Sequence, residues 1–210
     1  MRGMRSAPGN GRLVSTALVC EASCGRRPLQ LGRMSVRIGF LRAVNLGGRR
    51  VPMTALVAVC ESLGYADVWS YVNSGNVVFD TTRARASEEA AMQKALEDEF
   101  GFECTTFVRT AKQLSNILDT RPFTLAAGDT YFVTFLKKAP STGDAKRLEA
   151  LSNDFDTLVV HGAEVHWRMR GRSTDSHLAR RDWEKVLGPL SSTSRNVTML
   201  TKLVAKLDAA

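Results

Sequence analysis

The order of strands and helices predicted from the sequence assigns this chain to the α+β class. From residue 34 the apolar pattern changes repeatedly between strand and helix periods, in the order strand, helix, strand, strand, helix, strand. That βαββαβ order is typical of a ferredoxin-like unit. A second, related α+β subdomain with the order αβαββαα follows it, and glycine and capping residues between the segments set the boundaries.

The first unit, residues 34–110, opens with a strand at Val36–Val44 that is apolar on both faces, which is typical of a central strand. Pro52 then suits the start of a helix, and Gly64 supplies its end. A hairpin, a helix capped by Ser87 and ended by Gly101, and a final strand complete the unit: Asp67–Tyr71, Val77–Asp80, Ser87–Phe100 and Glu103–Arg109.

The second subdomain, residues 111–210, begins with a helix opened by a capping-box pair, Thr110 and Gln113. Thr193 or Ser194 is expected to cap the last helix, whose apolar residues recur at helical spacing. Between them we expect a strand, a helix, two hairpin strands and a helix: Tyr131–Lys138, Ala145–Leu151, Thr157–His161, Glu164–Arg170 and Ser176–Gly188. No sequence repeat is visible, so a duplication is indicated by topology alone.

The basic charge is concentrated in a leader, residues 1–33. The chain has a formal net charge of +8, and the leader, with six arginines against Glu21, contributes +5 of it. The remaining +3 is weak evidence for a polyanionic partner. We expect a disordered leader or a misassigned start, with translation beginning at Met34; a targeting segment is the less favoured alternative. No apolar stretch is long enough to cross a membrane.

The cysteines and histidines indicate neither a disulfide framework nor a metal site. Cys60 and Cys104 lie among apolar neighbours, and no second pair gives zinc-type spacing. We therefore expect buried free thiols in a reducing cytoplasm. The sequence identifies no cofactor, no metal ligand and no catalytic residue, and it leaves the oligomeric state open.

Two polar turns in the first unit form the best candidate site. One, Arg42–Gly48, follows the first strand, and the other, Tyr71–Asn76, joins the second and third strands. A ferredoxin-like topology places both at the same end of the sheet, which we call the turn edge. The predicted ligand-binding residues, with the segment before the last helix as a third contributor, are Arg42, Asn45, Gly47, Gly48, Asn73, Ser74, Asn76, Arg195 and Asn196.

The turn edge supports two interpretations. Gly47-Gly48 would let the backbone approach a small anionic or polar ligand, and the following helix would direct free N–H groups at it. Alternatively the same residues serve turn geometry alone, because Gly and Asn tolerate positive φ and Asn and Ser bond their own turns. Neither a Walker nor a Rossmann fingerprint is present.

The same segments carry a family resemblance. Arg42-Ala43-Val44-Asn45-Leu46-Gly47-Gly48, then Val51-Pro52-Met53 and Tyr71 to Phe79, resemble the signature of a bacterial family called domain of unknown function 1697. Thr193-Ser194-Arg195-Asn196 with Lys202-Leu203 is similar to its closing motif. The resemblance covers nearly all of residues 34–207 and implies an α+β fold with ferredoxin-like parts, without an established activity. Ala43 stands where Gly is usual, and Val197 where Trp follows Arg-Asn.

Two other functions are weaker alternatives. RNA-recognition motifs share the ferredoxin-like order, but the first and third strands here offer only Phe40 and Phe79 for base stacking. His166, Arg168 and Arg170 alternate with apolar residues, which indicates either a basic nucleic-acid surface or, preferably, a half-exposed strand that uses charge against edge pairing. An enzyme acting on a phosphorylated small molecule is a further alternative, with no residue that demands it.

Overall fold

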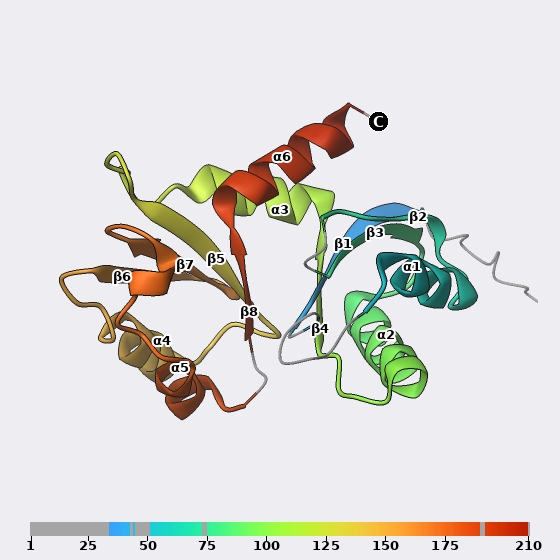
Figure 1. Cartoon of the computed structure of the whole chain (residues 1–210), viewed down its shortest axis with the longest axis horizontal. Coiled ribbons are helices and arrows are strands. Elements are labelled where there is room, and N and C mark those ends of the chain that lie inside the picture. Colours follow the sequence, from blue (N-terminus) through green and yellow to red (C-terminus); the bar gives the residue numbers. More distant parts are fainter. Residues whose placement is uncertain (1–33, 43, 45–50, 73–74, 190–191, 210) are drawn as a thin grey trace, which may run out of the picture. The chain divides into compact units, whose positions relative to one another are not determined.

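The computed structural model describes residues 34–42, 44, 51–72, 75–189 and 192–209. These residues form two four-stranded antiparallel sheets and six α-helices (Figure 1), which confirms the α+β class. The leader, with Cys20 and Cys24, lies outside the described residues. In the part of the chain that is described, no helix is long and apolar enough to cross a membrane.

The first sheet has the strand order β2-β3-β1-β4 of a ferredoxin-like unit. The first half of the fold consists of β1 (Ser35–Leu41), α1 (Met53–Ser62), β2 (Ala66–Ser70), β3 (Asn76–Thr81), α2 (Arg85–Phe100), β4 (Thr106–Thr110) and α3 (Ala111–Thr120). As predicted, β1 is central, paired with β3 and β4. The capping box of Thr110 and Gln113 and the left-handed Gly101 cap are also confirmed.

One helix start in this half was predicted wrongly. Ser87 does not cap α2, which begins at Arg85 after Ala84 and has no side-chain cap. The Glu88 N–H donates a 3.1 Å hydrogen bond to the Ala84 carbonyl, so Ser87 already lies inside the first turn of the helix.

The second sheet repeats the topology of the first, with the order β6-β7-β5-β8. The second half consists of β5 (Thr130–Leu136), α4 (Thr142–Glu149), β6 (Asp156–His161), β7 (Glu164–Met169), a 3-10 turn (Ser173–Asp175), α5 (Arg180–Leu187), β8 (Ser192–Asn196) and α6 (Val197–Asp208). Each half therefore has the order βαββαβα. In this repeated order, α3 of the first half corresponds to α6 of the second. The domain boundary predicted after residue 110 places α3 in the second subdomain instead, and that boundary stays a prediction.

Strand β8 corrects the predicted order of the second subdomain. Thr193 and Ser194 do not cap the last helix, because both lie in β8 and pair with β5. The cap of α6 is Asn196, whose Oδ1 accepts a 2.8 Å hydrogen bond from the Thr198 N–H. Likewise Ser176 does not start a helix: its Oγ donates to Asp156 Oδ1 at 2.8 Å, and α5 begins at Arg180.

The apolar core of the described residues lies in three layers. Phe79 and Met92 belong to the layer between the first sheet and α1 and α2, and Trp183 belongs to the layer between the second sheet and α4 and α5. The middle layer lies between the other faces of the two sheets and includes α3 and α6, which pack against each other (Figure 1). At its centre the rings of Phe40 and Phe135 stack with centroids 4.4 Å apart and planes inclined by 12°. The two halves thus share the middle layer of the core.

Candidate functional site

The described parts of the two polar turns are in direct contact. The Leu41 N–H at the end of β1 donates a 2.8 Å hydrogen bond to the Gly75 carbonyl, one residue before β3. Gly75 has φ +70°, and a Cβ there would overlap the Val44 side chain. A side chain at this position would therefore be strained by its backbone and would clash with a neighbour. The described residues of the two turns therefore lie together at one end of the first sheet.

Arg195 connects β8 to the turn edge. Its Nε donates to Asn76 Oδ1 at 2.6 Å, and its Nη2 donates to the Leu41 and Gly75 carbonyls at 2.7 and 3.4 Å. Nη1 donates to Thr193 Oγ1 at 2.8 Å and to the Ser194 carbonyl at 2.9 Å. We call Arg195 with these acceptors the Arg195 clamp. Its five N–H groups all have acceptors within the protein, so its role is to position the turn edge rather than to receive a ligand.

Burial lowers the pKa of Arg195 to about 10, which leaves the guanidinium charged at neutral pH. It also lies over the Phe40 ring, 5.6 Å from the centroid. A charged group this deeply buried is stable only when its hydrogen bonds are satisfied. The clamp therefore depends on each of its acceptors.

Asn76 and Asn196 also use their side chains within the fold. Asn76 is fully buried, and its Nδ2 donates to the Tyr71 carbonyl at 3.0 Å while its Oδ1 accepts from Arg195. Asn196 is the cap of α6. Because Asn76 has no exposed surface, it positions the turn instead of contacting a ligand. The other five predicted residues, Asn45, Gly47, Gly48, Asn73 and Ser74, lie outside the described residues.

Among the described residues of the two turns, Arg42 is a half-buried cation. Its Nη1 donates to the Ser192 carbonyl, and its Nη2 lies 3.4 Å from Glu184 Oε1. The same Oε1 is 2.6 Å from Arg180 Nε, so two guanidinium groups share one carboxylate. Desolvation, and secondarily the charge of Arg180, lower the pKa of Arg42. Its Nε is buried without a hydrogen-bond partner among the described residues.

The contacts of Arg195 and Arg42 recur, with the halves exchanged. Arg109 on β4 donates to Glu164 Oε1 and the Leu136 carbonyl, both at 2.7 Å, and lies 5.5 Å from the Phe135 ring centroid. Lys137 donates to the Thr106 carbonyl and lies 3.2 Å from Glu89. The corresponding residues are Arg195 and Arg109, Asn76 and Glu164, Leu41 and Leu136, Gly75 and Ala163, Phe40 and Phe135, Arg42 and Lys137, and Ser192 and Thr106. The two halves are joined by reciprocal contacts related by an approximate internal two-fold.

These contacts explain why the segments that carry the family resemblance lie together. The chain matches the profile described as a protein of unknown function, DUF1697, over residues 34–166, which is more than half its length. The chain belongs to the DUF1697 family. A comparison with curated proteins gave no significant match.

A solved structure shares the fold of this DUF1697 chain. It is the conserved bacterial protein SP0830 from Streptococcus pneumoniae, 18% identical, with a TM-score of 0.61. The match covers 83% of this chain and 99% of that one. At this identity the likeness concerns the fold.

The structure does not place the residues considered for nucleic-acid binding where the sequence predicted them, on exposed strand surfaces. Phe40 and Phe79 are fully buried, so neither can stack on a base. The prediction of a half-exposed strand at a sheet edge around His166 and Arg168 is wrong, because β7 pairs with β5 on one side and with β6 on the other. His166 is fully buried and shares a hydrogen bond with Tyr131. Among the described residues, no group of three His, Cys, Asp or Glu side chains is placed to hold a metal ion.

Sequence reasoning missed two features of this DUF1697 chain. One is the buried ion pair of Arg109 with Glu164, and the other is a pocket that includes Arg168 and Arg170. The short repeat Phe40-Leu41-Arg42 and Phe135-Leu136-Lys137 was the signal that could have revealed the two-fold, and with it the first of these. Spacing gave no comparable signal for the pocket, since its loop residues are distant in sequence from β7.

Proposed function

We propose that this protein binds a small anionic or polar ligand at the turn edge, with Arg42 as the contacting cation. Asn45, Gly47, Gly48, Asn73 and Ser74 complete the proposed site from the two turns. Asn76, Arg195 and Asn196 act as positioning residues, because their described contacts lie within the fold. We propose no reaction, since the described part of the site contains no nucleophile with an adjacent base.

The observation that supports this proposal is the surplus of hydrogen-bond donors on Arg42. The two-fold counterpart Lys137 makes the equivalent contacts, to a strand carbonyl and a helix carboxylate, with an ammonium group. A guanidinium has five N–H donors, and Arg42 uses two of its nitrogens for the same pair of contacts. Its buried Nε has no acceptor among the described residues. Arg42 therefore carries more donor capacity than the fold requires.

The charge around Arg42 supports an anionic ligand. Arg42 and Arg180 share the carboxylate of Glu184, which leaves one positive charge in excess among these three ion-paired side chains, while the Glu103 carboxylate acts on Arg42 from beyond ion-pair distance. Guanidinium groups bind carboxylate and phosphate oxygens in bidentate geometry. The excess charge lies where the chain leaves β1 and enters the turn, so a ligand held by the turn backbone would meet it.

We also propose a cytoplasmic location. Cys60 is a buried free thiol, as predicted, and burial raises the pKa of Cys60 to about 12. Free thiols are typical of proteins kept in a reducing compartment. Cell fractionation tests this, and recovery of the protein outside the cytoplasm would contradict it.

A thermal-shift screen of the full chain against nucleotides, sugar phosphates and inorganic anions tests the ligand site. A compound at a hundred times its Kd should stabilise the protein by about 2.7 kcal/mol. The variant Arg42→Lys copies the arrangement of Lys137, so it should keep the fold while weakening the binding of the same compound about tenfold.

The matched control is Lys137→Arg, which adds donors at the counterpart position, where the side chain contacts the Thr106 carbonyl and Glu89. It should leave the ligand-induced shift unchanged. If no compound raises the melting temperature, or if Arg42→Lys responds to the compound as the original chain does, the proposal is wrong.

A further inference from the structure

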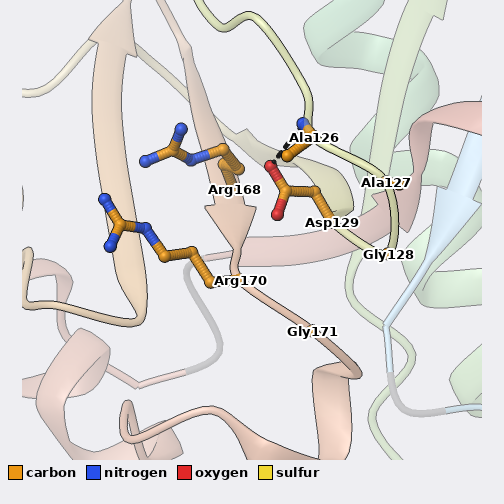
Figure 2. A pocket seen from close by; sticks show the side chains of 7 residues that line it. All are labelled: Ala126, Ala127, Gly128, Asp129, Arg168, Arg170 and Gly171. Atoms are coloured by element: carbon orange, nitrogen blue, oxygen red, sulfur yellow. Dashed lines mark hydrogen bonds between the residues drawn. The ribbon is translucent and has the colours of Figure 1, made fainter.

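A second electropositive feature lies at the end of β7 in the second half. The structure has a pocket of about 480 Å³ there, within the size range of small-molecule sites. Its lining is Ala126, Ala127, Gly128, Asp129, Arg168, Arg170 and Gly171 (Figure 2). The pocket shares no residue with the turn edge, so it is independent of the function proposed above.

Two arginines provide the charge of this pocket. Figure 2 shows the side chains of Arg168 and Arg170 extending in the same direction from β7 and the residue after it. Neither guanidinium forms an ion pair with a carboxylate in the described part of the chain, and that of Arg170 has no hydrogen-bond partner there. With Asp129 as the one lining carboxylate, the lining carries one positive charge in excess.

Arg168 is held in position, but its hydrogen bonding is incomplete. Its guanidinium lies 5.6 Å from the Phe123 ring centroid, and its Nη2 donates to Thr157 Oγ1 at 3.0 Å. Its Nε is buried with no acceptor among the described residues. Two fixed contacts on a long side chain reduce the entropy lost when a ligand binds.

The backbone around the two arginines is also fixed. The N–H of Arg170 donates to the Phe155 carbonyl at 3.0 Å, and Thr130 Oγ1 donates to the Gly171 carbonyl at 2.5 Å. On the opposite side, Asp129 Oδ2 accepts a 2.9 Å hydrogen bond from the Ala126 N–H, which closes the 126–129 turn on itself. Asp129 is therefore engaged by its own turn, and its carboxylate is not within ion-pair distance of either arginine.

We propose that this pocket binds the oxyanion group, phosphate or carboxylate, of a small molecule through Arg168 and Arg170. Guanidinium groups match the geometry of both oxyanions, and two that extend in the same direction from one strand end can bind one group side by side. The volume exceeds that of an inorganic ion, so the ligand carries further atoms beyond the oxyanion. The Asp129 carboxylate selects against a second negative group placed next to the turn.

Isothermal titration calorimetry of the full chain tests this with two probes, inorganic phosphate and acetate, at constant ionic strength. Arg168→Gln combined with Arg170→Gln should weaken binding of the preferred probe at least about tenfold, since charge-assisted hydrogen bonds are removed. The control Arg172→Gln removes the same charge from an exposed arginine that pairs with Asp175 outside the pocket. It should leave the Kd within about twofold.

Several outcomes would overturn the proposal. These are no binding of either probe by the original chain, an unchanged Kd in the double variant, or an equal loss in Arg172→Gln, which would indicate general attraction to positive charge. If Arg42→Lys weakens probe binding while the pocket variants do not, the anion binds at the turn edge and the pocket proposal fails alone. Circular dichroism checks folding, and Arg170→Gln by itself, at an exposed residue, replaces the double variant if the latter does not fold.

Discussion

Removing the donors of Arg195 should cost a large part of the stability of the fold. The change Arg195→Met keeps an apolar stem over the Phe40 ring but removes all five N–H groups. Two buried acceptors on other elements then lose their Arg195 donor, Asn76 Oδ1 and the Leu41 carbonyl, while the Gly75 carbonyl keeps its 2.8 Å hydrogen bond from the Leu41 N–H. Each such group costs about 1–3 kcal/mol, so we expect a loss of about 2–6 kcal/mol.

A double-mutant cycle with Asn76→Ala isolates the contact between the two side chains. Because Arg195 Nε and Asn76 Oδ1 form a buried, charge-assisted bond of 2.6 Å, the coupling free energy should be about 1.5–3 kcal/mol. Urea unfolding followed by circular dichroism gives the four free energies of unfolding by linear extrapolation. The same cycle on the exposed pair Arg147 and Asp144 is the control, with an expected coupling below about 1 kcal/mol. Additivity within about 0.5 kcal/mol for Arg195 and Asn76 would refute the clamp.

Three further predictions concern titration and backbone strain. Burial lowers the pKa of His166 to about 4, below its unfolded value near 6.5, so stability should be lost as pH falls through that window. His166→Gln should remove about 1–2 kcal/mol of the difference in unfolding free energy between pH 7 and pH 5, and an identical pH dependence would contradict this. Gly75→Ala should destabilise by about 2 kcal/mol or more, and Gly64→Ala by only about 1 kcal/mol, because both have positive φ but only Gly75 lacks space for a Cβ. Exposed Val72 has φ 49°, so Val72→Asn should raise the free energy of unfolding by about 1 kcal/mol, and a lower melting temperature would contradict the strain.

Most of the fold could be predicted because its strands and helices carry local apolar patterns. Strand β1 is apolar on both faces and proved central, and Gly101 and Thr110 ended and capped their helices as expected. Strand β8 could not be recognised in this way, because Ser192–Asn196 contains no apolar residue. Its buried positions, Thr193 and Arg195, are polar, so burial alternates along the strand while hydropathy does not. Only pairing with β5, far away in the sequence, defines it.

The sequence predicted the position of the candidate site more accurately than the roles of its residues. Topology placed the two turns at one end of a sheet, and the contact of Leu41 with Gly75 agrees with that placement. What the sequence could not indicate is the direction of each side chain. An Asn beside a Gly is equally compatible with a ligand contact and with an internal bond, and Asn76 forms the internal bond to a residue 119 positions away. The buried charge of Arg195 depends on that long-range contact as well.

The reciprocal contacts across the middle layer resemble those of a symmetric dimer interface, except that both sides of the interface belong to one chain. Each half supplies the arginine that satisfies carbonyl groups at the strand ends of the other, so neither half alone offers its own arginine the acceptors it has in the intact chain. A chain cut in the connection between α3 and β5 would accordingly yield two complementary fragments, each requiring the other to complete its structure. Local opening of either half is then opposed by contacts in both, and we expect the two sheets to unfold in one cooperative transition.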